Sequence, residues 1–362
     1  QLILAKVDGR LDLYEIKDIV EKVIEGSVKN VEVLTFKEGK ASWVSVRRAV
    51  VKTGSNKFVR IHVENGVVHE VHENHPVVVY ENKKLITKPA KELKRGDIIV
   101  SIASIPVMNE LKELDVLKIL EKYSAKLYVE GVGKLLRKIP HKVVALAAIN
   151  TGRSPKVIDE WKYKEVAIPY KALKRLKLKT EYSGLRVKYG GKGRSSIPAK
   201  LRLDKDFGFI IGAFLGDGSI NYDNKDGLPR RVVFYVGRDK ALIKRLIKAL
   251  ESIGVSKESI KVRTFNKGTY RVVVESKIFA LLIYELLHGK VTDYDRSVPL
   301  DIALRSVKEF REGIIEGYWM TDGSVFKDRR GYLRITAQTV NRKLAESIVT
   351  LLRTLGIYAT VT

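Results

Sequence analysis

One short pattern occurs twice in the sequence and restricts the possible fold more than any other feature. Residues 207–220 read FGFIIGAFLGDGSI, and residues 311–325 read REGIIEGYWMTDGSV. Asp217 aligns with Asp322, an offset of 322 − 217 = 105 residues. In each copy, an apolar stretch with helical spacing ends at an aspartate followed by a glycine, the residue that most easily adopts the turn ending a helix. The repeat predicts two equivalent helices within one chain.

The similarity continues beyond the two helices. Residues 236–255 align with residues 339–357, so each copy reads as helix, strand, strand, helix and then strand. We therefore predict an α+β domain over residues 203–362, built from pseudo-two-fold αββαββα repeats. The first repeat covers 203–295 and the second, which is incomplete, covers 296–362.

The two helix ends predict a metal site. Gly212 and Gly317 are equivalent, and small residues allow two helix backbones to approach closely. A carboxylate at a helix C-terminus is unfavourable by roughly 0.3–1 kcal/mol. A bound cation reverses that effect, because carboxylate and carbonyl oxygens are hard ligands for Mg²⁺. Two such ends, Asp217 and Asp322, predict a two-centre site of the kind that hydrolyses phosphodiesters.

The charge of the chain points to a polyanionic partner. Its 362 residues contain 68 Lys and Arg against 42 Asp and Glu, a net charge of +26. Such an excess is typical of nucleic-acid binding, although solubility alone is an alternative. There is no cysteine, which excludes disulfides, thiolate metal sites and a cysteine nucleophile within these residues. No apolar stretch is long enough to predict a membrane span, and no leader pattern is visible, so a cytoplasmic location is expected.

Residues 1–106 and 107–180 differ in pattern. Short alternating runs over 1–106 predict a mostly-β domain. The second segment has helical spacing, with a helix at 141–149, a glycine-bearing turn, and a further helix that begins at Pro155. This layout is typical of a helix-turn-helix that binds DNA, and a structural three-helix bundle is the alternative. The basic residues around the second helix suit phosphate contacts: Arg153, Lys156, Lys162 and Lys164.

Residues 181–202 are predicted to be a basic, glycine-rich linker that follows a phosphate backbone. In and just before this segment, the candidate DNA contacts are Lys171, Lys174, Arg175, Arg186, Lys188, Lys192 and Arg194. Candidates on the predicted strands of the repeats are Arg230, Arg231, Arg263, Lys267, Arg271, Arg330 and Arg334. For each of these, a solvated strand face is the alternative.

The repeated pattern resembles the LAGLIDADG motif of homing endonucleases. The stretch IIGAFLGDG (210–218) and the end of the second copy, IEGYWMTDG, carry the resemblance, which extends over about 203–362. It implies two motif helices at the core, a saddle of strands in the DNA major groove, and aspartates that hold Mg²⁺ or Mn²⁺ and cleave both strands. The implied site consists of the catalytic metal ligands Asp217 and Asp322, the carbonyl ligands Gly216 and Thr321, and the electrostatic stabiliser Arg296.

The first 105 residues resemble the Hint-fold splicing domain of an intein. The stretch VHEVHENHPVVVY (68–80) is similar to the segment whose histidine assists the first acyl shift. The resemblance implies this role for His75, with His72 where the family usually has threonine; a hydrogen-bonded histidine at a strand start is the alternative. Inteins begin with Cys or Ser and end with His-Asn, whereas the sequence begins QLIL and ends TVT. We therefore expect that this segment lacks both splice junctions and cannot splice by itself. In its precursor, it would have host-protein exteins as partners.

Together these features predict an intein-borne, site-specific DNA endonuclease that is a monomer with an internal pseudo-dimer and acts on double-stranded DNA. Two alternatives remain open. One is a regulator that binds DNA without cutting it, and the other is a self-processing element whose nuclease has decayed. The presence of both Asp217 and Asp322 favours the endonuclease.

Overall fold

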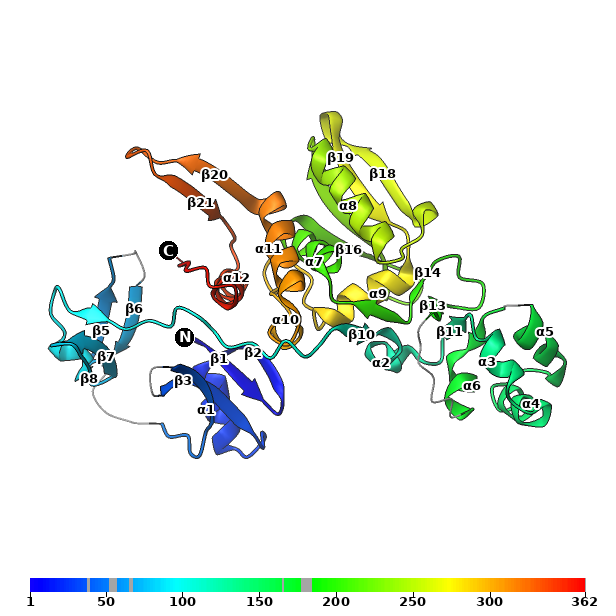
Figure 1. Ribbon diagram of the computed structural model, residues 1–362, viewed down its shortest axis with the longest axis horizontal. Helices are drawn as coiled ribbons and strands as arrows, with labels where there is room; N and C mark the ends of the chain where they lie inside the picture. Colours follow the sequence, from blue (N-terminus) through cyan, green and yellow to red (C-terminus); the bar gives the residue numbers. More distant parts are fainter. Residues whose placement is uncertain (38–39, 52–56, 65–67, 165, 177–183, 362) are drawn as a thin grey trace. The chain divides into compact units, whose positions relative to one another are not determined.

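The computed structural model of the protein describes residues 1–37, 40–51, 57–64, 68–164, 166–176 and 184–361 (Figure 1). Contacts within the chain define two units. The first unit contains Gln1–Val107 and Arg342–Thr362, and the second contains Met108–Asn341. This division differs from the four predicted segments, because the last residues of the second repeat are grouped with the N-terminal unit. Within the described ranges, no helix is both long and apolar enough to cross a membrane.

The first unit is mostly β, in agreement with the β pattern of residues 1–106. Its strands form three sheets, with the orders β2-β1-β3-β4, β5-β6 and β8-β7-β9. Ala5, Ile19 and Val31 form a small core. The elements are β1 (Leu2–Val7), β2 (Arg10–Glu15), α1 (Ile16–Ile24), β3 (Val31–Lys37), β4 (Lys40–Ser45), β5 (Phe58–His62), β6 (Val68–His72), β7 (Pro76–Glu81), β8 (Lys84–Pro89), η1 (Ala90–Glu92), β9 (Ile98–Ile99) and α12 (Arg342–Thr354).

The N-terminal part of the second unit combines short helices with a sheet of order β12-β11-β13-β14. The predicted helix at 141–149 is present as α4, and the Ser154 hydroxyl accepts a hydrogen bond from the Lys156 amide where the next helix begins. The elements are β10 (Glu113–Asp115), α2 (Val116–Ile119), η2 (Glu121–Tyr123), β11 (Leu127–Glu130), α3 (Gly133–Arg137), α4 (His141–Ile149), η3 (Pro155–Val157), α5 (Ile158–Tyr163), β12 (Ile168–Pro169), α6 (Tyr170–Arg175), β13 (Arg186–Tyr189), β14 (Ser196–Pro198) and β15 (Lys200–Arg202).

The segment predicted as a linker differs from that expectation. Residues 181–183 lie outside the described residues, but strands β13, β14 and β15 occupy much of 184–202. Val187, Ile197 and Leu201 are buried. Apolar residues alternate with polar ones in each of these strands, which is the pattern of half-buried strands. The high density of lysine and arginine hid this alternation in the sequence.

The rest of the second unit contains the first repeat and most of the second, whose last helix, α12, is grouped with the first unit. The first repeat has the predicted order αββαββα, and its four strands form a sheet of order β16-β17-β19-β18. The second repeat has the order helix, strand, strand, helix. The elements are α7 (Lys205–Asp217), β16 (Gly218–Tyr222), β17 (Pro229–Gly237), α8 (Lys240–Ser252), η4 (Lys257–Ser259), β18 (Ile260–Phe265), η5 (Asn266–Gly268), β19 (Thr269–Val274), α9 (Lys277–Leu286), α10 (Leu300–Ala303), α11 (Lys308–Asp322), β20 (Gly323–Lys327) and β21 (Leu333–Ala337).

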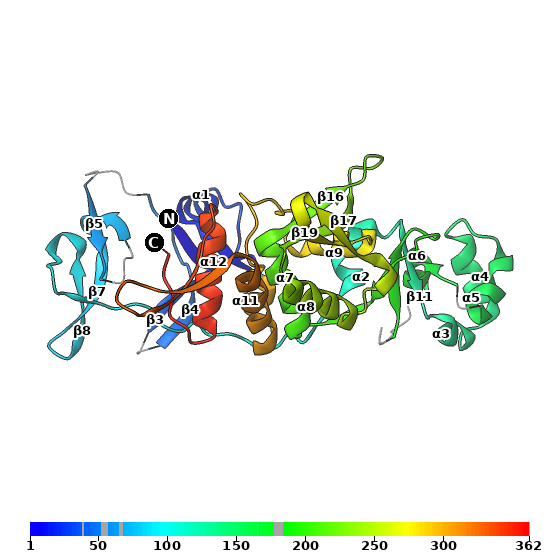
Figure 2. The ribbon, with the colours of Figure 1, turned by 90° about the horizontal axis from the view of Figure 1, so that it is seen from above.

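Helices α7 and α11 lie side by side at the centre of this unit (Figures 1 and 2). Glycines line their contact: Gly208 and Gly212 on α7, and Gly313 and Gly317 on α11. A Cβ atom added at any of these four positions would lie 2.0–2.2 Å from a backbone oxygen of the other helix. Such a separation is far below van der Waals contact, so only glycine permits the observed approach. The predicted pairing of the two motif helices is therefore observed.

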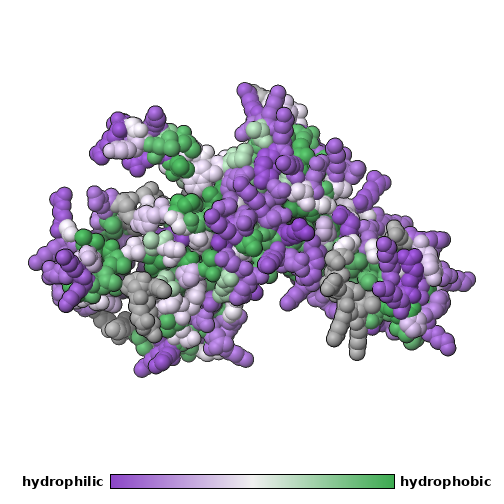
Figure 3. All heavy atoms as spheres, in the orientation of Figure 1, coloured by the Kyte–Doolittle hydropathy of each residue, from purple (hydrophilic) through white to green (hydrophobic). Residues whose placement is uncertain are grey.

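Strands β20 and β21 form a two-stranded hairpin with an exposed apolar side. Val325 and Ile335 face each other across the hairpin and are each 60% exposed. Val232, which occupies the place of Ile335 in the first repeat, is fully buried. Part of this apolar side is visible as a green patch in Figure 3. Among the described residues, the hairpin therefore lacks the apolar cover that its counterpart has.

The close helix contact makes a stability prediction. We expect Gly212→Ala to lower the free energy of unfolding by about 2 kcal/mol or more, because a methyl group at this position meets the Ile314 carbonyl and forces the helices apart. The gain in helix propensity, about 1 kcal/mol, is too small to compensate. Urea denaturation measures the effect.

The matched control is Lys244→Ala, on the exposed side of α8, which should change the unfolding free energy by less than about 0.5 kcal/mol. Equal stability of Gly212→Ala and the unmodified protein would show that α7 and α11 are not in backbone contact.

Candidate active site

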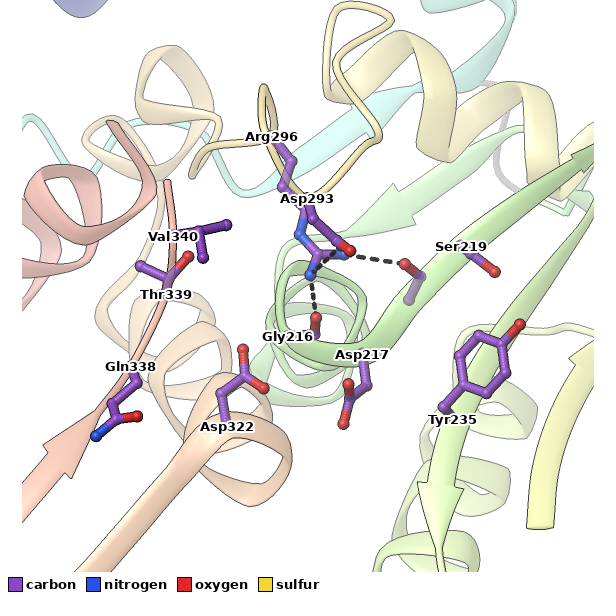
Figure 4. A pocket seen from close by; sticks show the side chains of 11 residues that line it. Gly216, Asp217, Ser219, Tyr235, Asp293, Arg296, Asp322, Gln338, Thr339 and Val340 are labelled. Atoms are coloured by element: carbon purple, nitrogen blue, oxygen red, sulfur yellow. Dashed lines mark hydrogen bonds and ion pairs between the residues drawn. The ribbon is translucent and has the colours of Figure 1, made fainter. Parts of the chain in front are cut away.

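The adjacent ends of α7 and α11 open into one cavity of about 500 Å³. Both motif aspartates line it, and Figure 4 shows their carboxylates next to each other at the ends of the two helices. A Cβ atom added at Gly216 would lie 3.5 Å from Cγ of Asp322, which shows how close the two helix ends are. The lining residues are Gly216, Asp217, Gly218, Ser219, Tyr235, Asp293, Arg296, Asp322, Gln338, Thr339 and Val340.

The two carboxylates are electrostatically strained. The surrounding protein removes water from Asp322 and, together with the negative charge of Asp217, raises the pKa of Asp322 from 3.8 to about 6. Part of the Asp217 side chain is exposed, yet the cavity walls also raise its pKa, and the positive charge of Arg296 opposes this effect. No hydrogen bond or ion pair to either carboxylate is found among the described residues. Two negative charges without partners are what a cation-binding site requires.

Arg296 is buried beside Asp217 and donates to backbone carbonyls. Its Nη1 atom donates to the carbonyls of Phe214 at 3.2 Å and Gly218 at 2.9 Å, and its Nη2 atom donates to that of Gly216. Nη2 also forms an ion pair with Asp293 at 2.8 Å. The guanidinium thus binds three backbone carbonyls at the C-terminal end of α7. The resemblance predicts that Arg296 stabilises charge in the cavity, whereas these hydrogen bonds are directed at the protein.

Of the two carbonyl ligands predicted from the resemblance, the Gly216 carbonyl is already hydrogen-bonded, and the role of the Thr321 carbonyl stays a prediction. The Gly216 carbonyl accepts a hydrogen bond from Arg296, and this nearby positive charge opposes cation binding there. The Thr321 hydroxyl donates to the carbonyls of Gly317 at 3.2 Å and Tyr318 at 2.9 Å. Over the described ranges, no group of three or more His, Asp or Glu side chains forms a metal cluster. The carboxylates of Asp217 and Asp322 therefore fit a divalent cation, while the Gly216 carbonyl does not.

One face of the first repeat's sheet is basic and adjoins this cavity. Tyr235 of β17 pairs with Arg271 of β19, which pairs with Arg263 of β18, so the three side chains share a face. Arg231 lies four residues before Tyr235 on the same strand, and because side chains alternate along a strand, the two share a face. Tyr235 also lines the cavity. Three of the predicted DNA contacts are thereby gathered beside the two aspartates.

The opposite face of the same sheet packs against a motif helix. Phe234 of β17 contacts Phe214 of α7, with ring centroids 6.3 Å apart. Arg230 points to this side, because it alternates with Arg231, and its side chain is exposed. Arg230 is therefore separated from the other predicted contacts of this sheet.

The remaining predicted DNA contacts have mixed environments. The side chain of Lys267 lies outside the described residues. Lys162 is buried and donates from Nζ to the Ile139 carbonyl at 2.9 Å, a position unlike the expected phosphate contact. Its helix turns it inward, which the charge pattern could not reveal. The predicted contacts with exposed side chains outside the basic face are Arg153, Lys156, Lys164, Lys171, Lys174, Arg175, Lys192, Arg194, Arg230, Arg330 and Arg334.

Two predicted contacts between residues 184 and 202 instead hold the fold together. Arg186 donates to the Ser196 hydroxyl and to the carbonyls of Ser196 and Gly254. Lys188 forms an ion pair with Glu130 at 3.0 Å, with both side chains largely covered. These bonds tie the strands to their neighbours, and neither side chain has the exposure expected of a phosphate contact.

The predicted splicing histidines lie in the first unit. His75 is exposed, and its carbonyl accepts a hydrogen bond from the Ala90 amide. The Nδ1 atom of His72 accepts a hydrogen bond from the Asn74 amide at 3.2 Å, and its ring packs edge-on against Phe58. The roles assigned to both histidines stay predictions.

The sequence did not single out two cavity residues that occupy equivalent places in the repeats. Gly218 pairs with Phe234 and Gly323 pairs with Ala337, so the residues that follow, Tyr235 and Gln338, correspond. They lie 235 − 217 = 18 and 338 − 322 = 16 residues after their aspartates. The second hairpin is two residues shorter, and a fixed offset of 105 therefore misses the pair.

Comparison with known families agrees with the repeats. Residues 204–287 and 309–362 match the family of LAGLIDADG-like domains. These two stretches contain α7 and all but the first residue of α11, with both aspartates, and they skip the connection between the repeats. This part of the chain is therefore similar to LAGLIDADG-like domains.

Three similar proteins come from archaea. An uncharacterized protein of Methanocaldococcus jannaschii is 25% identical over 92% of this chain and 36% of its own length. The DNA polymerase II large subunit of Thermococcus kodakarensis is 25% identical over 97% of this chain and 19% of its length. The Rpo1C subunit of DNA-directed RNA polymerase of M. jannaschii is 21% identical over 88% of this chain and 29% of its length. The chain thus spans a minor part of each relative.

One similar solved structure is the homing endonuclease I-WcaI bound to its DNA recognition sequence. It is 20% identical, and the match covers 41% of this chain and 67% of that chain with a TM-score of 0.29.

The raised pKa of Asp322 makes a prediction about stability. Because its pKa is higher in the folded protein than its ordinary value of 3.8, the ionised carboxylate destabilises the fold above about pH 6. Without divalent cations, Asp322→Asn should therefore raise the free energy of unfolding at pH 8. We expect a gain of about 1–2 kcal/mol, less than the full shift implies because the side chain is partly exposed. Denaturation in EDTA at several pH values measures it.

The gain should shrink toward zero as the pH falls to 4, where the folded protein already holds the proton. Asp159→Asn, at an exposed position of α5, is the control and should have less than about 0.5 kcal/mol of effect throughout. A gain of the same size at pH 4 and pH 8 would rule out the charge as its cause.

Proposed function

We propose that this chain is a site-specific endodeoxyribonuclease that cleaves both strands of double-stranded DNA, depends on Mg²⁺ or Mn²⁺, and acts in the cytoplasm. The observation that carries the proposal is the pair of unpartnered carboxylates, Asp217 and Asp322, at adjacent helix ends in one cavity of the described structure. The match of both repeats to the family of LAGLIDADG-like domains supports it.

In this proposal, Asp217 and Asp322 hold the divalent cation. When bound, the cation would activate water and stabilise the leaving oxygen of the scissile phosphodiester. The chain's own contribution is position, because the glycine contacts between α7 and α11 fix the separation of the two carboxylates. Tyr235 and Gln338 on the cavity walls offer hydrogen-bonding groups to water or phosphate from equivalent sides.

DNA binding follows from the charge of the sheet face. Arg231, Arg263 and Arg271 share the face that adjoins the cavity, so a duplex bound there would present its backbone to the two aspartates. Most of these contacts would be to phosphates, and a few would read bases. Two fused repeats supply both halves of the site, which suits a monomer with an internal pseudo-dimer.

The helical region at 141–164 would act as a helix-turn-helix and add to the surface that contacts DNA. Arg153, Lys156 and Lys164 are exposed at the turn and on the following helix, as such a contact requires. Lys162 is excluded from this role because it is buried.

We further propose that the chain is part of an intein. The DNA polymerase and RNA polymerase subunits have different functions by name, yet each contains a segment similar to most of this chain. A similar segment in two proteins with different names, where it covers 19% and 29% of their length, is what an insert carried by several hosts would produce. Within such a precursor, residues 1–106 would act as a Hint-type splicing domain, with His75 and His72 near its reaction and the host exteins on either side.

Loss of either carboxylate should abolish cleavage. We expect Asp217→Asn and Asp322→Asn each to lower the rate of double-strand cleavage at least about 1000-fold, because metal binding needs both charges. DNA affinity should stay within about threefold, since neither residue is on the basic face. Gel assays of a plasmid carrying the target, with Mg²⁺ added, measure cleavage, and mobility shifts measure binding.

The exposed Asp159→Asn variant serves as the control and should cut normally. If the unmodified protein binds its target tightly but never nicks it, the chain is a regulator without nuclease activity. Weak, salt-sensitive binding without sequence preference would indicate a decayed nuclease.

The basic face can be tested with two adjacent arginines. Arg231→Ala should weaken DNA binding by about 1 kcal/mol or more and lower the slope of log affinity against log salt by about 1, because one phosphate contact is lost. Arg230→Ala removes the same charge from the opposite face and should change affinity by less than about twofold. Equal effects of the two substitutions would refute the assignment of the face.

The intein assignment predicts excision. Expression of the complete reading frame should yield a joined host protein that lacks this segment, together with the free insert, and mass spectrometry identifies both products. His75→Ala should slow their appearance at least about tenfold by weakening general acid–base assistance of the first acyl shift. A reading frame that stays intact, with no joined product under any condition, would argue against splicing.

A further inference from the structure

The ends of the two motif helices are held by different devices. At the end of α11, the stabilising donor belongs to the helix itself, because the hydroxyl of Thr321 donates to the carbonyls of Gly317 and Tyr318. At α7, the donor comes from the connection between the repeats, where Arg296 contacts three carbonyls at the end of the helix. The aspartates are equivalent in sequence, but the structures that hold them in place differ.

The donors of Arg296 are used within the protein. Nη1 binds two carbonyls, and Nη2 binds the Gly216 carbonyl and Asp293 (Figure 4). The remaining donor, Nε, is buried and has no partner among the described residues. The whole side chain is only 7% exposed. An arginine in this arrangement has no exposed donor left with which to contact a phosphate in the cavity.

A second buried residue anchors Arg296. The side-chain amide of Asn341 donates to the Arg296 carbonyl at 2.7 Å, and Asn341 is 5% exposed. The backbone amide of Asn341 donates to the hydroxyl of Thr339 at 3.2 Å, and Thr339 lines the cavity. A continuous set of hydrogen bonds thus joins the cavity wall of the second repeat to the end of α7 in the first.

We propose that Arg296 is a positioning residue, anchored by Asn341, that fixes Asp217 by holding the last turn of α7, and that it does not contact the DNA itself. A cation at a helix C-terminus is favourable, and three carbonyls bound to one rigid guanidinium restrict the turn more than one ammonium could. Only the expected effect of Arg296 on cleavage rests on the proposed endonuclease function. The effect on α7 can be measured without any activity.

Hydrogen exchange of two equivalent amides tests the proposal in the metal-free protein. The Gly218 amide donates to the Phe214 carbonyl at the end of α7, and the Gly323 amide donates to the Trp319 carbonyl at the end of α11. Arg296→Lys keeps the positive charge but lacks the planar fork that binds three carbonyls. It should speed exchange of the Gly218 amide at least about tenfold and that of Gly323 less than about twofold, because only α7 loses its donor.

Two further variants separate positioning from general loss of stability. Arg311 is another buried arginine, which donates to the Ser306 carbonyl near the start of α11. Arg311→Lys is the matched control and should leave Gly218 exchange unchanged. Asn341→Ala keeps the guanidinium but removes its anchor, and should speed Gly218 exchange at least about threefold even if Arg296→Lys fails to fold.

Cleavage by Arg296→Lys completes the test. We expect its single-turnover rate to fall at least about tenfold while its affinity for the target stays within about twofold, as misplacement of Asp217 requires. Normal Gly218 exchange with slow cleavage would overturn the proposal, because Arg296 would then act on the DNA directly. Equal acceleration at Gly218 and Gly323 would also overturn it. If the unmodified protein does not cleave, the endonuclease proposal fails, while the exchange result still decides the role of Arg296.

Discussion

The contact between the backbones of α7 and α11 determines where the two motif aspartates lie in the second unit. Glycines at four positions bring each helix onto the carbonyl oxygens of the other, and a single methyl group would separate them. Because the helices cannot slide or part without losing this contact, their C-terminal ends are fixed beside each other. The cavity, its two carboxylates and the adjoining strand face all depend on that separation.

The sequence was sufficient to predict the centre of this arrangement. The duplicated motif identified Gly212 and Gly317 as contact positions and Asp217 and Asp322 as neighbours, because equivalent helices in one chain pair most simply by pseudo-symmetry. The pattern of apolar residues also predicted the order of elements in the first repeat and the helix at 141–149. These features are local or periodic, so they can be read without knowing how distant segments meet.

Other features needed the structure because long-range packing determines them. The charge pattern gave no sign that Lys162 turns inward to a carbonyl or that strands occupy much of residues 186–202. Arg296 was assigned a direct electrostatic role, but its partners lie about 80 residues earlier in the chain, at the end of α7. Tyr235 and Gln338 were missed because unequal hairpin lengths break the numerical repeat.

Fusing the two repeats into one chain frees each half to change independently. Tyr235 and Gln338 occupy equivalent places on the cavity wall, and α7 and α11 are held by different groups. A dimer of identical subunits reads a sequence with matching two-fold symmetry. Under the proposed function, a duplex bound by these unlike halves would need no such symmetry, so the recognition site would be free to be a non-palindromic sequence with a defined left and right end.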